Sequence, residues 1–232
     1  TVRVTKNTLP KIYEAHFRPD GNAVIFRSLK DGSDTIENLS LTLTPPNVKA
    51  TSTLYAVSST PIRGDIKSVA VGGNTLFYAS KDTSNIVASN FNGTGPRTLV
   101  TSPFNNWHLV AEGNNLLAYT NASANVAGYA YKVNTTSGGL TKVLGPLSGL
   151  TATINGSGNR VVYSYNDGQE MRTFVKNLET SELSEISYAT IADKCVWGEA
   201  YILYCAAPID DPRIGDLDSW YRGITHFSDR IW

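Results

Sequence analysis

The fold is decided by the stretch His16-Phe17-Arg18-Pro19-Asp20-Gly21-Asn22-Ala23-Val24-Ile25-Phe26. We expect it to form a strand, a tight turn and a second strand. Pro19 fixes its backbone φ angle and has no N–H to donate to a strand ladder, so it ends the first strand. Asp20 is a turn-forming residue, and Gly21 is free to adopt positive φ. An apolar, β-prone run begins at Ala23, and the stretch therefore predicts a β-hairpin.

Four further copies of this hairpin pattern follow along the chain. When the copies are aligned on the glycine of the turn, the shared position is held by Gly21, Gly73, Gly113, Gly158 and Gly198. These glycines recur about every 40 to 50 residues, which is the period of a four-stranded propeller blade. One such unit cannot bury both of its apolar faces alone, so neighbouring units have to stack. The repeat therefore predicts an all-β protein built as a β-propeller.

The composition agrees with many short strands and argues against several functions. Charged residues make up 17% of the 232 residues, and the formal net charge is zero. No basic run points to a nucleic-acid partner. No apolar run approaches the roughly 18 residues that a membrane-spanning segment needs. The sequence shows no initiator Met and no signal peptide, so we interpret it as a mature or excised piece.

We expect a single propeller domain over residues 1–232, with five blades. The predicted blades cover residues 12–58, 66–101, 107–144, 150–189 and 194–232. The last blade has only three strands, and its third strand is predicted at residues 220–232. The spare strand at residues 2–6 can pair beside that strand and close the ring, which removes two sheet edges that would promote aggregation.

Three connections between strands carry their own predictions. Residues 58–61 (Ser-Ser-Thr-Pro) predict a turn after the first blade, and residues 145–149 predict a break between the third and fourth blades. Residues 178–192 carry acidic residues at a helix-like spacing of three. Because Thr, Ser, Ile and Tyr dominate that segment, we expect a strand at residues 183–189.

The two cysteines flank the predicted turn near Gly198. Cys195 begins one strand and Cys205 ends the next. Antiparallel neighbours can bring two such Cβ atoms within bonding range. The alternative is a pair of buried free thiols. A disulfide would indicate an oxidising compartment.

Several segments carry a resemblance to known propellers. Phe17-Arg18-Pro19-Asp20-Gly21 resembles the Phe-Ser-Pro-Asp-Gly element of TolB-type, WD40-like (PD40) repeats. Other segments resemble a group of secreted propellers of candidate-phyla (Parcubacteria-like) bacteria. These segments are Thr8-Leu9-Pro10-Lys11-Ile12-Tyr13-Glu14-Ala15, Lys194-Cys195-Val196-Trp197, Tyr204-Cys205-Ala206-Ala207-Pro208, Asp218-Ser219-Trp220-Tyr221-Arg222-Gly223 and Phe227-Ser228-Asp229-Arg230-Ile231-Trp232. The resemblance implies an extracellular or cell-surface propeller with a disulfide. Members of the group are longer at both ends, so the alternative architecture is a fragment of a six- or seven-bladed ring.

The histidines and acidic residues give little support to catalysis or metal binding. His16 and His108 lie on predicted innermost strands and His226 on a predicted third strand, so we expect solvated or hydrogen-bonded side chains. No Gly-x-Ser-x-Gly element supplies a nucleophile. The best metal candidate is the acidic loop, but it lacks the EF-hand order, so we expect solvated carboxylates and no metal or other cofactor. The acidic residues of that loop are Asp210, Asp211, Asp216 and Asp218.

A glycosidase-like enzyme is the alternative to a non-catalytic role. Glycosidases on five-bladed propellers need two carboxylates that face the central channel. The innermost strands here carry Glu14 and Glu112 and little else that is acidic. We therefore expect no catalytic residues.

The aromatic side chains fall into two groups. Trp107, Trp197 and Trp232 lie on predicted strands and are expected to pack between blades. Trp220 and Tyr221 follow the acidic loop, and packing between blades and contact with a ligand remain alternatives for them. They lie on the rim that a propeller's second-to-third-strand loops share with the connections between blades. The predicted ligand-binding residues on this rim are Asp216, Asp218, Trp220 and Tyr221.

These observations favour a non-catalytic binding or scaffolding propeller of a secreted or surface-anchored bacterial protein. We expect its partner to be a protein or a glycan, and its location to be extracellular or on the cell surface. A third hypothesis is a purely architectural part of a larger assembly.

Overall fold

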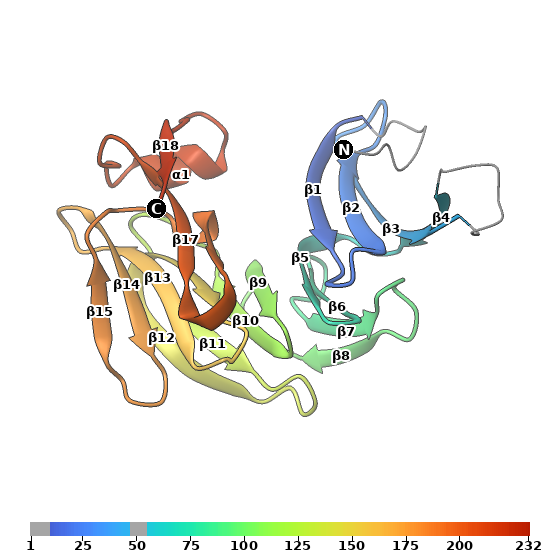
Figure 1. Cartoon of the computed structure of the whole chain (residues 1–232), viewed down its shortest axis with the longest axis horizontal. Coiled ribbons are helices and arrows are strands. Elements are labelled where there is room, and N and C mark those ends of the chain that lie inside the picture. The colour runs from blue at the N-terminus through green and yellow to red at the C-terminus, as the bar shows by residue number, and fades with distance from the viewer. Residues whose placement is uncertain (1–9, 47–54) are drawn as a thin grey trace.

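The computed structural model describes residues 10–46 and 55–232. Antiparallel sheets dominate it and follow one another in chain order around a central region (Figure 1). The prediction of an all-β protein is confirmed. The strand predicted at residues 2–6, and with it the predicted closure of a five-bladed ring, lies outside the described residues. Within them, no strand of the first sheet pairs with the last sheet.

Each of the first two sheets contains four strands in chain order. The first comprises β1 (Ile12–Phe17), β2 (Ala23–Leu29), β3 (Ile36–Thr44) and β4 (Ala56–Ile62). The second comprises β5 (Ile66–Gly72), β6 (Thr75–Ser80), β7 (Ile86–Asn90) and β8 (Arg97–Val100). The predicted turn at residues 58–61 is wrong, because these residues continue β4 along β3. β4 is the outer edge strand, where a proline is tolerated.

The stretch at residues 16–26 folds as the predicted hairpin. The Gly21 amide donates to the Arg18 carbonyl at 2.8 Å, and the Arg18 amide donates to the Ala23 carbonyl at 2.9 Å. Gly21 has a φ of 70°, and the glycines at the same position of the next three copies also have positive φ. In the fifth copy Gly198 has a φ of −95°. There Tyr201 adopts the left-handed conformation instead, with a φ of 69°.

The third and fourth strand groups form one seven-stranded sheet. It comprises β9 (Trp107–Glu112), β10 (Asn115–Thr120), β11 (Ala127–Val133), β12 (Leu140–Ile154), β13 (Arg160–Asn166), β14 (Met171–Asn177) and β15 (Leu183–Ile186). The predicted break at residues 145–149 is wrong, because β12 runs through it. β12 pairs with β11 up to Ser148 and with β13 from Ser148 onward. Positive φ at Gly145 and Gly149 lets the strand bend there without ending.

The last sheet contains three strands and is interrupted by short helices. Its elements are the 3₁₀ turn η1 (Ala192–Lys194), β16 (Cys195–Trp197), the 3₁₀ turn η2 (Glu199–Tyr201), β17 (Leu203–Pro208), the helix α1 (Asp216–Tyr221) and β18 (Asp229–Ile231). The predicted third strand at residues 220–232 is therefore wrong in its first part, and His226 lies between α1 and β18. Leu217 and Trp220, three residues apart, share one face of α1 and both join an apolar cluster. Burial of that face favours the helix over a strand.

Apolar clusters fill the spaces between successive strand groups. One cluster joins Phe77 and Ile86 to Trp107 and Leu116, and similar clusters lie on either side of it. Trp107 is 1% exposed and Trp197 is 9% exposed, so packing is confirmed for both. Trp232 is 51% exposed, although its ring stacks on Tyr188 at 4.7 Å between ring centroids.

Candidate functional site

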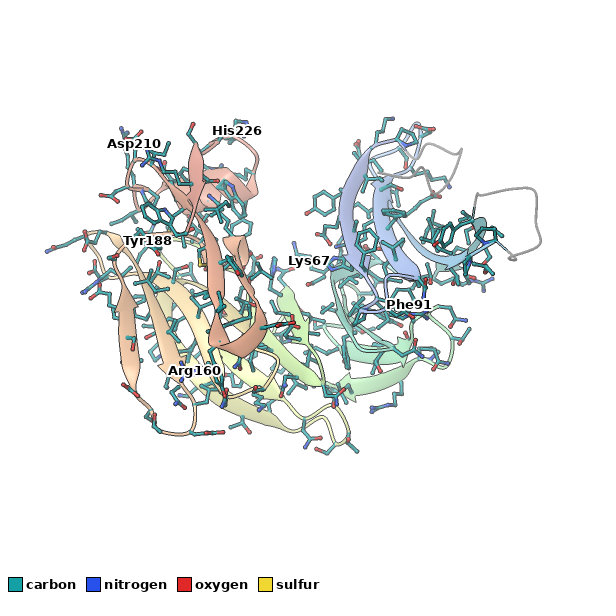
Figure 2. All side chains as sticks on the ribbon, in the orientation of Figure 1. Lys67, Phe91, Arg160, Tyr188, Asp210 and His226 are labelled. Carbon is teal, nitrogen blue, oxygen red and sulfur yellow. A yellow bond between two sulfur atoms is a disulfide. The ribbon has the colours of Figure 1, made fainter. Side chains whose placement is uncertain are left out.

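Residues 209–228, which connect β17 to β18, carry the residues predicted to bind a ligand. We call this segment the α1 rim. All four predicted residues lie on α1, so the structure does bring them together. The Ile209 amide donates to the Ser228 carbonyl at 2.9 Å and closes the base of the segment. Figure 2 shows Asp210 and His226, both from this segment, at one end of the molecule.

Three of the four predicted residues hold the α1 rim in place. The Asp218 carboxylate accepts a hydrogen bond from the Ala124 amide at 2.9 Å, which ties α1 to the loop between β10 and β11. The Asp216 carboxylate accepts one from the Arg213 amide at 2.8 Å, within the segment. Trp220 packs against the cluster that contains Leu217, which is fully buried. These contacts give α1 a fixed position on the sheets beneath it.

The fourth predicted residue, Tyr221, belongs to a hydrogen-bond network. Its hydroxyl donates to one oxygen of the Asp193 carboxylate at 2.6 Å, and the Tyr119 hydroxyl donates to the other at 2.5 Å. His108 stacks on the Tyr119 ring, and its Nδ1 lies 3.3 Å from the Tyr119 hydroxyl oxygen. The network therefore joins α1, η1 and the β9–β10 hairpin.

The surroundings of this network keep both tyrosines protonated. Burial, together with the negative charge of Asp193, raises the pKa of the Tyr119 and Tyr221 hydroxyls well above their usual range. Both phenols thus remain hydrogen-bond donors around neutral pH. The Asp193 carboxylate accepts from both of them. Sequence reasoning predicts a solvated or hydrogen-bonded His108. It misses Asp193 and Tyr119, because nothing in the sequence relates η1 to the β9–β10 hairpin.

Apolar side chains, together with charged ones such as Asp210 and Arg222, are exposed on the α1 rim. Ile209 is 55% exposed, Ile224 is 65% exposed and Tyr221 is 37% exposed. The acidic residues of the rim do not gather into a cation site: among the described residues, no group of three or more His, Cys, Asp or Glu side chains is arranged to hold a metal ion. The α1 rim therefore presents exposed apolar side chains to the surroundings.

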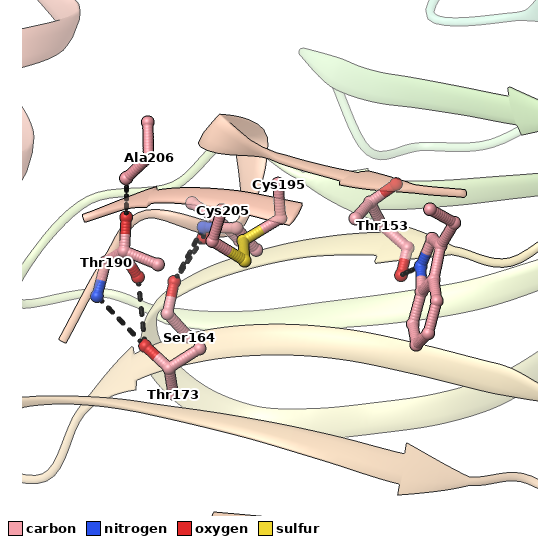
Figure 3. The surroundings of a disulfide bond; sticks show 10 residues. Thr153, Ser164, Thr173, Thr190, Cys195, Cys205 and Ala206 are labelled. Atoms are coloured by element: carbon pink, nitrogen blue, oxygen red, sulfur yellow. Dashed lines mark hydrogen bonds between the residues drawn. A yellow bond between two sulfur atoms is a disulfide. The ribbon is translucent and has the colours of Figure 1, made fainter. Parts of the chain in front are cut away.

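A disulfide and hydrogen bonds from two threonine hydroxyls stabilise the last sheet (Figure 3). Cys195 and Cys205 are bonded, as predicted, across directly paired positions of β16 and β17. Thr190 donates through its hydroxyl to the Ala206 carbonyl at 2.6 Å, and the Thr173 hydroxyl donates to the Thr190 carbonyl at 3.1 Å. These bonds link β17 to β14, so the last sheet is fastened to the seven-stranded sheet.

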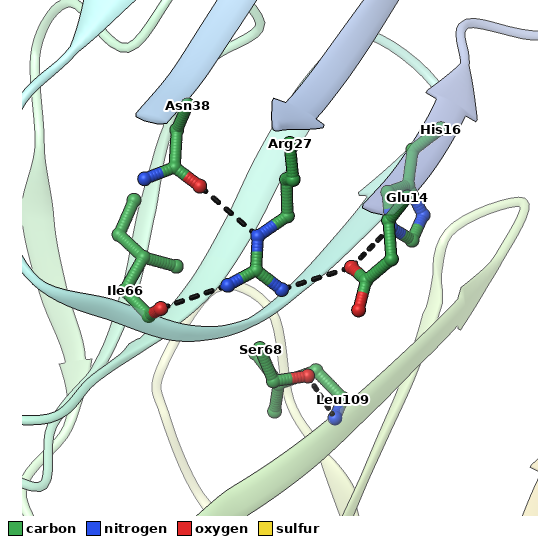
Figure 4. A network of polar contacts seen from close by, with 7 residues as sticks. All are labelled: Glu14, His16, Arg27, Asn38, Ile66, Ser68 and Leu109. Atoms are coloured by element: carbon green, nitrogen blue, oxygen red, sulfur yellow. Dashed lines mark hydrogen bonds and ion pairs between the residues drawn. The ribbon is translucent and has the colours of Figure 1, made fainter. Parts of the chain in front are cut away.

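A second polar network lies between the first two sheets (Figure 4). The Arg27 guanidinium, which is 1% exposed, donates to Glu14 at 2.9 Å, to the Asn38 side chain at 3.0 Å and to the Ile66 carbonyl at 2.8 Å. His16 Nε2 lies 3.1 Å from the same Glu14 oxygen. Burial raises the pKa of Glu14, but the hydrogen bonds from His16 and Arg27 and the Arg27 charge outweigh burial and lower it overall. Glu14 is therefore the ionised partner of a buried arginine.

The other acidic residue of an innermost strand, Glu112, borders a groove between β1, β5 and β9. The groove has a volume of about 510 Å³ and is mostly apolar, with His16 and Glu112 as its titratable groups. Burial raises the pKa of Glu112. Glu14 is directed to Arg27 between the sheets and does not line this groove, so the two carboxylates do not face a common space.

No protein-family model and no curated protein sequence matches the chain. Among solved structures, TolB from Acinetobacter baumannii has a TM-score of 0.61 at 8% identity, over 84% of this chain and 48% of that one. A puromycin hydrolase S511A mutant complexed with PGG has a TM-score of 0.59 at 14% identity, over 89% and 35%. A chain of the nidogen/laminin complex has a TM-score of 0.55 at 14% identity, over 88% and 80%.

The chain therefore spans about half the length of that TolB and about a third of the puromycin hydrolase. At these identities the likeness shows the fold alone. Together with the strand order above, it shows that the chain is an all-β protein with a TolB-like propeller fold.

Proposed function

We propose that this chain is a non-catalytic binding or scaffolding propeller of a secreted or surface-anchored bacterial protein. It recognises a protein or a glycan through the α1 rim, which carries Asp216, Asp218, Trp220 and Tyr221. One structural neighbour is a chain of the nidogen/laminin complex. That neighbour supports a role in protein binding.

The observation that carries the proposal is that the α1 rim is held in a fixed position while two apolar side chains of the same segment stay exposed. Asp218 and Tyr221 tie α1 to two different parts of the propeller, and Leu217 buries its inner face. Ile209 and Ile224 remain exposed on the same segment. A preorganised segment loses little conformational entropy on binding, and exposed apolar groups gain by burial against a partner.

The disulfide supports an extracellular or cell-surface location. Disulfides persist in oxidising compartments and are rare in the cytosol of most organisms. Within the described residues, no helix is long and apolar enough to cross a membrane.

The test compares exposed apolar residues inside and outside the α1 rim. Ile209→Asp and Ile224→Asp place charges on the rim, and Leu183→Asp places one on β15, where Leu183 is equally exposed at 55%. We expect both rim variants to lose binding on a glycan array or in affinity capture from a cell-envelope extract, while Leu183→Asp binds as wild type. Equal binding by the rim variants and the wild type would contradict the assignment of the rim.

A further inference from the structure

A second cavity lies at the end of the sheets opposite the α1 rim. It has a volume of about 350 Å³ and sits between the β12–β13 hairpin and the β16–β17 turn. Since β17 leads from this turn at one end to the α1 rim at the other, the two sites are separated by the length of a strand. Figure 2 shows Arg160, the first residue of β13 after that hairpin, away from Asp210 and His226 of the rim.

The residues that line this cavity carry no charge. An ionic ligand would lose its water there without gaining an opposite charge from the walls. Trp197 is 9% exposed, and its indole N–H donates to the Thr153 carbonyl at 3.5 Å, which orients the ring. The volume lies within the range of small-molecule sites, so the cavity suits a compact neutral ligand. The lining residues are Asn155, Gly156, Ser157, Trp197, Gly198 and Tyr201.

Tyr201 is presented at the edge of the cavity by an unusual backbone. Its φ of 69° places a bulky residue in the left-handed region, which is costly for any side chain other than glycine. The short 3₁₀ turn maintains this conformation, because the Gly198 amide donates to the Ile202 carbonyl at 2.8 Å and the Ile202 amide donates to the Glu199 carbonyl at 3.0 Å. Tyr201 nevertheless remains 51% exposed. Backbone strain that keeps an aromatic ring in the open is typical of a binding position.

Arg160 supports the Tyr201 ring from outside the cavity. Its guanidinium carbon lies 4.5 Å from the ring centre, which is a cation–π contact. Arg160 itself borders a separate, smaller space that it shares with Glu182. The arginine therefore helps to hold the ring in place and leaves the cavity uncharged.

The β12–β13 hairpin supplies hydrogen-bond donors on the other side of the cavity. The Asn155 side chain accepts from the Asn159 amide at 3.0 Å and the Arg160 amide at 2.9 Å, which fixes the turn. Within the described chain, the Gly156 and Ser157 amides at the tip of this turn have no hydrogen-bond acceptor. Ser157 is also exposed and offers its hydroxyl. One wall of the cavity is thus polar, and the other carries an exposed ring.

We propose that this cavity binds a neutral saccharide. The C–H face of a sugar ring packs on the exposed part of the Tyr201 ring, and sugar hydroxyls accept hydrogen bonds from the Gly156 and Ser157 amides. A purely apolar ligand would leave these donors unpaired. A proline-rich peptide also packs on aromatic rings, but it needs an extended groove lined with them, and only one lining ring is exposed here. The cavity is a separate site, so the proposal does not depend on the α1 rim.

The test is an NMR titration of the full chain, resolved by backbone amide, with chitotetraose, cellotetraose and mannotetraose as neutral saccharides. A hyaluronan tetrasaccharide, which carries glucuronate, and a proline-rich peptide are the counterparts. We expect a neutral saccharide to bind more tightly than either counterpart and to shift the amide signals of Gly156, Ser157 and Gly198. Ile224→Asp, from the α1 rim, should bind it as wild type.

Two substitutions of Tyr201 separate binding from folding. Tyr201→Ala and Tyr201→Gly both remove the ring, so both should weaken saccharide binding about tenfold or more. Tyr201→Gly should unfold at a higher urea concentration than Tyr201→Ala, because glycine adopts positive φ readily. Tyr13→Ala is the matched control, since Tyr13 is 63% exposed and also has an arginine over its ring, with the Arg27 guanidinium carbon at 5.7 Å. It should bind as wild type.

Several outcomes would overturn the proposal. They are the failure of all three neutral saccharides to bind, equal binding of the acidic saccharide or the proline-rich peptide, and shifted amide signals confined to other parts of the chain. Unchanged binding by Tyr201→Ala, or loss of binding in Ile224→Asp, would also overturn it.

Discussion

Tyr221 donates its hydroxyl hydrogen to the Asp193 carboxylate at 2.6 Å, and this bond connects α1 to the start of the last sheet. The two residues are 28 positions apart in the sequence. Tyr221 lies in α1, which follows β17, and Asp193 lies in η1, which precedes β16. Asp193 also accepts from the buried Tyr119. The position of the α1 rim thus depends on one carboxylate that serves two phenols.

The first prediction concerns this bond. Tyr221→Phe removes one of the two donors to Asp193 and keeps the ring. We expect the free energy of unfolding to fall by about 1–3 kcal/mol, the usual contribution of a hydrogen bond to a charged group. Urea unfolding measures the change, and Tyr13→Phe is the control, because Tyr13 is 63% exposed. If Tyr221→Phe unfolds with the same free energy as the wild type and Tyr13→Phe, the bond to Asp193 does not stabilise the α1 rim.

The second prediction concerns the disulfide between β16 and β17. The bridge joins residues with a sequence separation of 10. In the chain-entropy account, a loop of this size adds about 2–3 kcal/mol by restricting the unfolded chain. We expect the Cys195→Ser/Cys205→Ser double variant to lose that amount in urea unfolding. Mass measurement after thiol alkylation, with and without reductant, checks the bond itself, and two thiols labelled without reductant would contradict it.

Local sequence signals predicted most of the fold. The hairpin at residues 16–26 could be predicted because Pro19, Asp20 and Gly21 act on their own backbone. The disulfide could be predicted because the two cysteines flank a single turn. In contrast, β12 runs through residues 145–149, where two glycines with positive φ bend the strand instead of ending it. Gly and Pro mark a change of direction, and only tertiary pairing decides whether a strand stops there.

The candidate site was less accessible to sequence reasoning. The sequence predicts Trp220 and Tyr221 on a strand beside the acidic loop, with packing and ligand contact as alternatives for their rings. The structure instead packs Trp220 with Leu217, and tertiary burial decided between helix and strand over these few residues. Asp193 carried no local signal, because its role depends on contacts with Tyr119 and Tyr221, which are distant in sequence.

The third prediction is a pH dependence that involves Glu14. Its pKa is lowered in the folded protein, so its contribution to stability is fully present above the unfolded value near 4.5 and is lost as the pH falls through the folded value. Glu14→Gln should cost about 1–3 kcal/mol at neutral pH, because it takes the charged partner from a buried arginine. The difference from wild type should shrink as the pH falls from about 5 to about 3. Urea unfolding across this range measures it.

Asp31→Asn is the control for that series. Asp31 pairs with Lys11 at 3.0 Å, but its side chain is 82% exposed, so the ion pair is screened. We expect this variant to follow the wild-type pH profile. A constant difference between Glu14→Gln and wild type at all pH values would show that Glu14 does not titrate in the predicted way.

The fourth prediction tests closure by residues 2–6. The Trp232 amide and carbonyl exchange hydrogen bonds with Cys205 at 3.0 and 3.1 Å, so they face β17. Because alternate residues of a strand face opposite neighbours, the Ile231 amide points away from β17. The described residues supply no strand on that side. If residues 2–6 pair there, hydrogen exchange at Ile231 should be slow in the full chain and at least about tenfold faster after deletion of residues 1–6. The Trp232 amide is the internal control, because its bond to Cys205 is retained in both proteins. Fast exchange at Ile231 in the full chain, or an unchanged rate after the deletion, would contradict closure by this strand.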